Sequence, residues 1–172
     1  MSLRKAFALF WWAGLIVFAL AIFLGMQVTP DPAMPGIGDH QVAGTGARVN
    51  DIHAAWEAAG TTDLAKAAML ADLVFIGLFG AGCMLGGWYY WRTGRTIVAV
   101  LGLAALIGGA VFFVTDYVET IAQVVQLFRD RGGDRYAALA AAMQQPKVAS
   151  FLVAFFGIAL AFAIRRVLGR PA

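Results

Sequence analysis

Four charged side chains interrupt the apolar stretches of this chain and are its candidates for chemistry. Asp72, Asp116, Glu119 and Lys147 each lie inside or against an apolar run. A charge in hydrocarbon is costly, so we expect these residues to face the interior of the protein and to pair with one another. Asp116 and Glu119 are three residues apart and share one face of a helix. Carboxylates held this close can also keep a proton, which a proton relay or general acid–base catalysis would need.

The depth of these charges follows from their distance along the chain to the nearest basic segment. Asp72 lies 20 residues before Arg92, Asp116 lies 20 residues after Thr96, and Lys147 is separated from the C-terminal basic cluster by a similar length. At 1.5 Å per helical residue, each charge is about 30 Å from the inner boundary. We therefore expect three helices to bring these charges to one level near the outer edge of the hydrocarbon, with Lys147 as partner of the acids.

Polar neighbours extend this cluster, since Gln123 follows Glu119 by four residues and Ser150 follows Lys147 by three. The predicted ligand-binding residues are Asp72, Asp116, Glu119, Gln123, Lys147 and Ser150. Three interpretations stay open: charges that tie helix ends together, a pocket for a ligand or cation, and a proton relay or catalytic site. No phosphate loop, nucleophile elbow or HExxH motif occurs, so we predict no catalytic residue and favour a protein that is not an enzyme.

The histidines and the single cysteine give no sign of a cofactor. His40 and His53 lie 13 residues apart outside the apolar stretches, without further ligands at convincing spacing, so we predict neither a metal site nor a haem. We interpret His53 as a solvated or interfacial residue beside Trp56. Cys83 is interpreted as a small packing residue within an apolar run.

Long apolar stretches must position these side chains. Hydrophobic residues make up 61% of the chain and charged residues 13%, whereas a soluble domain carries about a quarter of charged residues. About 20 apolar residues span a bilayer, and a backbone in lipid must close its own hydrogen bonds, which favours helices. We predict one all-α domain, an integral membrane up-down four-helix bundle with helices at about 6–28, 64–91, 96–127 and 147–168.

Two external loops are expected to carry short amphipathic helices. Three prolines open the first loop, 29–63, and a helix capped by Asn50 or Asp51 should follow, with Ile52 and Trp56 on one face. The second loop breaks at two glycines, and its helix should then end at Pro146.

Charge asymmetry predicts the orientation and the partners. The N-terminus, the loop at 92–95 and the C-terminus with Arg165, Arg166 and Arg170 carry bases and no acids. We therefore expect a multi-pass protein of the inner membrane with both termini in the cytoplasm. Its expected partners are membrane lipids. Association through the glycine-rich second helix, into a homo-oligomer or a larger complex, is also open. Nucleic-acid binding has no support in the sequence.

The segments ADLVFI around Asp72, TDYVET around Asp116 and PKVASF around Lys147 resemble a group of small bacterial four-helix membrane proteins without an assigned activity. The group places an acid on helix two, an acid-x-x-Glu-Asn pattern on helix three and Lys-Phe at the start of helix four. Here Thr120 replaces the Asn and Val148 replaces the Phe. The resemblance covers roughly the last 110 residues and implies a fold and a shared polar cluster. We expect a non-enzymatic protein that binds a small ligand or lipid, or an accessory subunit; a proton- or cation-coupled carrier and a membrane-embedded enzyme are the alternatives.

Overall fold

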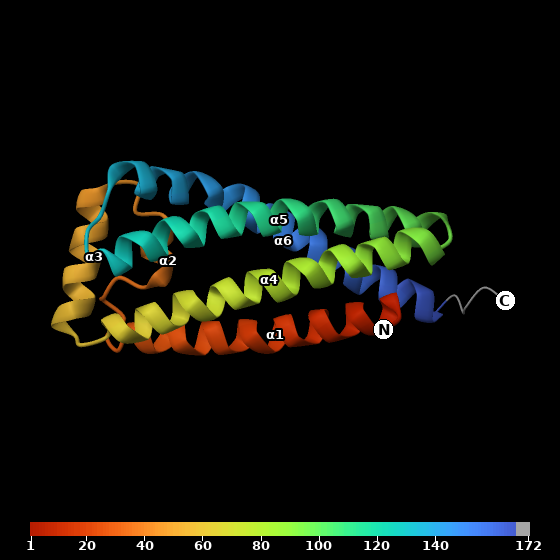
Figure 1. The fold of residues 1–172 in the computed structure, drawn as a ribbon, viewed down its shortest axis with the longest axis horizontal. Coiled ribbons are helices and arrows are strands. Elements are labelled where there is room, and N and C mark those ends of the chain that lie inside the picture. Colours follow the sequence, from red (N-terminus) through yellow and green to blue (C-terminus); the bar gives the residue numbers. More distant parts are fainter. Residues whose placement is uncertain (168–172) are drawn as a thin grey trace. The chain divides into compact units, whose positions relative to one another are not determined.

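The computed structural model describes residues 1–167 as six helices with no strand among them (Figure 1). The helices are α1 (Leu3–Val28), α2 (Ile37–Gln41), α3 (Gly46–Ala58), α4 (Thr62–Thr93), α5 (Thr96–Phe128) and α6 (Asp134–Val167). Four of these, α1, α4, α5 and α6, are long and apolar enough to cross a membrane, which confirms the predicted all-α class and the four long apolar helices. Residue 168, the predicted end of the fourth span, and Arg170 lie outside the described residues.

Two compact units make up the chain, and each of the four long helices contributes to both. Unit 1 contains Met1–Leu15, Ile76–Val114 and the described residues from Pro146 onward. Unit 2 contains Ile16–Phe75 and Thr115–Gln145, and therefore all of α2 and α3.

The core of unit 1 is aromatic. The ring centroid of Phe79 lies 5.1 Å from those of Trp11 and Phe151 and 5.5 Å from that of Phe112. Aromatic pairs at such separations contribute about 0.5–1.5 kcal/mol beyond the area they bury. Rings from four different helices thus stabilise this unit.

Glycines of α4 permit close helix approach within unit 1. A Cβ atom on Gly82 would lie 2.9 Å from the backbone nitrogen of Trp11, and one on Gly87 would collide with the backbone of Leu106. One on Gly86 would meet the ring of Phe7. Small residues are used in this way wherever helices pack without bulky side chains between them. The predicted glycine-rich face is therefore occupied, at these positions, by helices of the same chain.

Residues 29–61, here called the connection, link α1 to α4 and contain α2 and α3. In Figure 1, α3 lies across the ends of α4 and α5. The predicted amphipathic helix exists, but its predicted cap is wrong: α3 starts at Gly46, where the Thr45 hydroxyl accepts a hydrogen bond from the Arg48 N–H. Asn50 instead accepts a 2.6 Å hydrogen bond from the Gly132 N–H. Helix α2 was not predicted because Gly and Pro surround it.

Two helix ends in unit 2 adopt the same left-handed termination. After α3, Thr61 N–H donates to the Trp56 carbonyl while Gly60 has a φ of 69°. After α5, Arg131 N–H donates to the Gln126 carbonyl while Asp130 has a φ of 50°. This geometry satisfies carbonyls at a helix terminus and favours glycine, with aspartate tolerated. It turns the chain sharply from α3 into α4 and from α5 toward α6.

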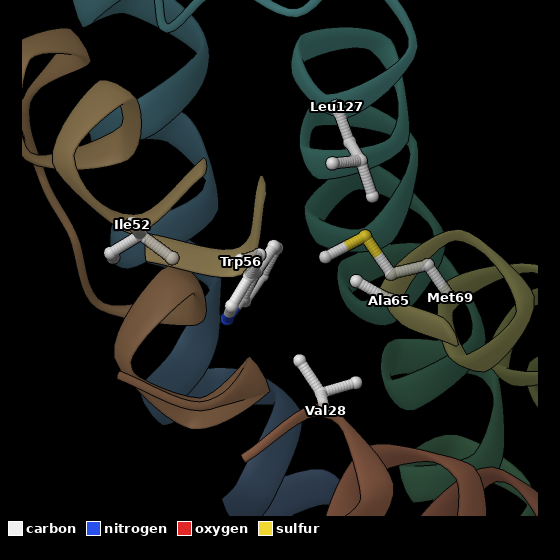
Figure 2. Close-up of a cluster of buried hydrophobic side chains, with 6 residues drawn as sticks. All are labelled: Val28, Ile52, Trp56, Ala65, Met69 and Leu127. Atoms are coloured by element: carbon white, nitrogen blue, oxygen red, sulfur yellow. The ribbon is translucent and has the colours of Figure 1, made fainter. Parts of the chain in front are cut away.

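A buried cluster joins four helices of unit 2 (Figure 2). Its members are Val28, Ile52, Trp56, Ala65, Met69 and Leu127. The predicted burial of one face of the amphipathic helix is confirmed, since Ile52 and Trp56 are fully buried. The indole N–H of Trp56 donates to the Pro35 carbonyl at 2.7 Å, which ties α3 to the proline-rich start of the connection.

The prediction that Pro146 ends a separate short helix is wrong, because α6 runs through Pro146 from Asp134 to Val167. A proline removes one backbone donor and costs about 3 kcal/mol in a helix interior. An alanine-rich sequence precedes it, and apolar spans must keep their backbone hydrogen-bonded, so the helix continues. Ser150 donates its hydroxyl hydrogen bond to the Pro146 carbonyl at 2.6 Å.

Candidate functional site

A hydroxyl group joins two of the predicted acids. Thr120 Oγ1 lies 3.0 Å from Asp72 Oδ2 and 3.5 Å from Asp116 Oδ1, so its one proton can serve either carboxylate. The phenol of Tyr117 donates to the Leu73 carbonyl at 3.1 Å. Both contacts connect α4 with α5. Thr120, which the sequence did not mark as a candidate, is thus a residue of the site.

A buried polar row continues along α5 beyond these acids. Glu119, Gln123 and Gln126 are each 1% exposed or less. Gln123 Nε2 donates to Glu119 Oε1 at 3.2 Å, and Gln126 Oε1 accepts from the Gly133 N–H at 3.0 Å. Buried amides need such partners because each unpaired group would cost about 1–3 kcal/mol. The row therefore stabilises the end of α5 and the turn into α6.

Lys147 and Ser150 lie in unit 1. Both are buried, and the Ser150 hydroxyl donates hydrogen bonds to backbone carbonyls of its own helix. The expectation that Lys147 pairs with the acids of α4 and α5 stays a prediction.

Unit 2 contains a partly open cavity of about 210 Å³. Its walls are Phe18, Ala21, Ile22, Gly25, Ile37, Gln41, Ala68, Met69, Asp72 and Gln123. Most of these side chains are apolar, and polar groups enter from α2, α4 and α5. Two predicted residues, Asp72 and Gln123, line the cavity. Gln41 was missed because nothing in the sequence places α2 against the long helices.

His40 and His53 meet in the connection, contrary to the interpretation of His53 as solvated. His40 is 2% exposed and His53 5%, and their Nε2 atoms lie 3.0 Å apart. The ring centroids are 5.1 Å apart and the ring planes differ by 16°. Because the centroids are much farther apart than the Nε2 atoms, the rings meet edge to edge, as in an N–H···N hydrogen bond. Trp56 lies beside both rings, as its proximity in sequence predicts for His53.

Burial keeps this histidine pair neutral. Burial and the charge of His53 lower the pKa of His40 from 6.5 to about 4, and the Gln123 side chain acts in the opposite direction. Burial also lowers the pKa of His53, against the attraction of the Asp130 carboxylate. The Nδ1 atoms of both rings are buried without a hydrogen-bond partner.

The described residues contain no group of three or more His, Cys, Asp and Glu side chains that could hold a metal ion. Two imidazoles facing each other at 3.0 Å also leave no room for an ion on the line between them, since each metal–nitrogen bond needs about 2.0 Å. The arrangement can accept and share protons, and the cavity can hold a small molecule with an apolar part.

No family model, no curated protein and no solved structure matches the chain. The four long apolar helices are compatible with a small multi-pass membrane protein. The resemblance to bacterial four-helix proteins stays an expectation drawn from short motifs.

Proposed function

We propose that this chain is a small polytopic inner-membrane protein, not an enzyme, that binds a small amphipathic ligand or part of a lipid in the cavity of unit 2. One observation carries the proposal: Asp72 and Gln123, two residues selected for their polarity within apolar stretches, line the same cavity. Charged side chains inside membrane helices face protein interiors or water-filled spaces and mark the paths and sites of substrates and ions.

The chemistry of the walls supports an amphipathic occupant. Phe18, Ile22 and Met69 offer hydrocarbon, whereas Asp72 and the two glutamines offer hydrogen-bonding groups. Pockets for drug-sized ligands measure about 300–1,000 Å³, and this cavity is smaller at about 210 Å³. It suits a short chain segment or a headgroup rather than a whole lipid.

The proposed orientation follows from the basic segments and places both termini in the cytoplasm. The connection is then periplasmic, and the cavity, whose walls include Ile37 and Gln41 of α2, opens in the outer half of the membrane. Ligand-binding roles for Asp116, Glu119, Lys147 and Ser150 stay predictions, as does association with other chains.

Gentle detergent extraction followed by native mass spectrometry tests the proposal, with phosphatidylethanolamine added at pH 7 as the probe. We expect the wild type to retain the probe or a copurified molecule. Ala21→Leu should abolish retention because it fills the cavity, and Asp72→Asn should weaken it because it removes the charged acceptor.

Ala19→Leu is the matched control, since the same substitution on an exposed position of α1 leaves the cavity unchanged. Equal retention by wild type, Ala19→Leu and Ala21→Leu would contradict the proposal. A stoichiometric protein partner instead of a small molecule would favour an accessory subunit. Misassembly of both Ala21→Leu and Asp72→Asn would indicate that these positions serve packing alone.

A further inference from the structure

The chain contains two histidines, and the fold brings both together at a buried contact. His40 lies on α2 and His53 on α3, and their Nε2 atoms are 3.0 Å apart. A neutral imidazole has one N–H donor and one nitrogen acceptor. One ring must therefore donate its Nε2–H, and the other must carry its proton on Nδ1 and accept at Nε2.

Successive protonation changes this contact in two steps. A first added proton enters the free Nδ1 of the donor ring, and the Nε2–H···Nε2 bond persists in charge-assisted form. A second added proton must occupy the accepting Nε2. Both Nε2 atoms then carry hydrogen, no acceptor remains, and two cations face each other across the contact. The doubly protonated pair cannot keep the geometry of the structure.

This contact fastens a short element that forms part of the cavity wall. α2 has five residues, and two of them, Ile37 and Gln41, line the cavity. Beyond the histidine contact, its side chains are held by the 3.4 Å hydrogen bond from Gln144 Nε2 to Gln41 Oε1. A helix of this length has no stability of its own in water. Its position therefore depends on tertiary contacts: the histidine pair, the bond from Gln144 and the packing of Ile37 against the buried cluster of unit 2.

We propose that His40 and His53 form a proton-binding latch, which holds α2 over the cavity when neutral and releases it when both imidazoles are protonated. The latch itself stands on the histidine geometry; its consequence for a ligand rests on the proposed function of the cavity.

The groups around the pair set the order of protonation. Asp130, after the end of α5, attracts a proton to His53. Gln123 of α5 acts on His40 without a charge, and Trp56 of α3 flanks both rings. Asp39 of α2 precedes His40, and its carboxylate accepts a hydrogen bond from the Gly36 N–H. His53 therefore takes the first proton, and release waits for His40.

Hydrogen exchange of the ligand-free wild-type protein in detergent, corrected for intrinsic rates, tests the latch between pH 7 and pH 4. Because the pKa of His40 is about 4 in the closed state and 6.5 when exposed, the equilibrium constant for opening should rise by about 100-fold across this range. We expect loss of protection in residues 37–58 and unchanged protection within α4. At pH 7, a scalar coupling between the Nε2 nuclei of His40 and His53 should report the shared proton.

Three variants make the test specific. His40→Gln/His53→Gln leaves no histidine and should retain its protection at pH 4 at the level of pH 7. Asp130→Asn should shift the wild-type transition to higher pH, because losing this carboxylate lowers the pKa of His53 in the closed state further below its exposed value. The substitution keeps a residue that tolerates positive φ. Asp130→Glu, which keeps the charge, should leave the midpoint closer to that of the wild type.

Constant wild-type protection between pH 7 and pH 4 would overturn the latch, even if the variants failed to fold. So would an equal loss in the histidine-free variant, or tight Zn²⁺ binding at pH 7 that depended on both histidines. Failure of the probe to bind at pH 7 would instead refute the cavity function and leave these exchange results unaffected.

Discussion

Trp56 offers the sharpest test of how the connection is held in place. Its indole ring is fully buried in the cluster with Val28 and Met69, and its N–H donates to the Pro35 carbonyl at 2.7 Å. Trp56→Phe keeps an aromatic ring but removes the donor. Trp56→Ala removes the ring as well.

The magnitudes follow from these two contributions. Loss of a hydrogen bond that leaves a partly buried carbonyl unpaired costs about 1–2 kcal/mol, so Trp56→Phe should lower the free energy of opening by that amount plus a smaller packing loss. Removal of a buried tryptophan side chain costs about 3–5 kcal/mol. Trp56→Ala should therefore leave the connection largely open under conditions in which the wild type is closed.

Protease protection of residues 29–61 in detergent measures this opening directly. Trp12→Phe is the control because Trp12 is 63% exposed on α1 and should tolerate the change within about 0.5 kcal/mol. If Trp56→Phe were as well protected as Trp12→Phe, the 2.7 Å hydrogen bond and the burial would contribute nothing to closure. The account of the unit 2 core would then be refuted.

Three further outcomes are expected. Gly132→Ala should destabilise the protein by about 1–3 kcal/mol in denaturant unfolding, because its Cβ would collide with the Gly46 carbonyl; Gly38→Ala, with open space around it, should not. Thr120→Val should destabilise by about 1–3 kcal/mol, since it removes the hydroxyl shared by two carboxylates, while Thr120→Ser should retain most of the stability. Because folding lowers the pKa of His40 from 6.5 to about 4, the unfolded state binds more protons in this window. The free energy of unfolding, measured at several pH values, should therefore be highest above pH 6.5 and fall by about 3 kcal/mol toward pH 4. His40→Gln should remove this pH dependence.

The long helices could be predicted because a bilayer requires each segment that spans it to be apolar over its whole length. A segment such as Leu3–Val28 has to stay apolar over its whole length, and that pattern is visible without any partner. Polar residues within such stretches were equally conspicuous, which is why Asp72 and Gln123 could be selected before the cavity was seen. Both features can be recognised from the residue types alone, without knowing which other segments the residues contact.

The connection could not be predicted in the same way because its structure depends on distant contacts. Asn50 has the side chain of a good helix cap, yet its partner is Gly132, 82 residues away. His40 and His53 were only placed outside the apolar stretches, and His53 was interpreted as solvated or interfacial. The sequence between them does not reveal that α2 folds back on α3. The prediction at Pro146 was wrong for the opposite reason. A local rule, that proline ends a helix, did not hold because the apolar span continues through this position as one helix.

The contact between the start of α3 and the α5–α6 turn has a consequence for how the protein is made. Gly46 N–H donates to the Asp134 carboxylate, 88 residues further along the chain. At about 5–20 residues per second, translation reaches that partner about 4–18 seconds after Gly46 has been synthesised. During this interval the indole of Trp56 and both imidazoles await their final packing. Newly made chains are thus most open to proteolysis and chaperones until the start of α6 has been synthesised.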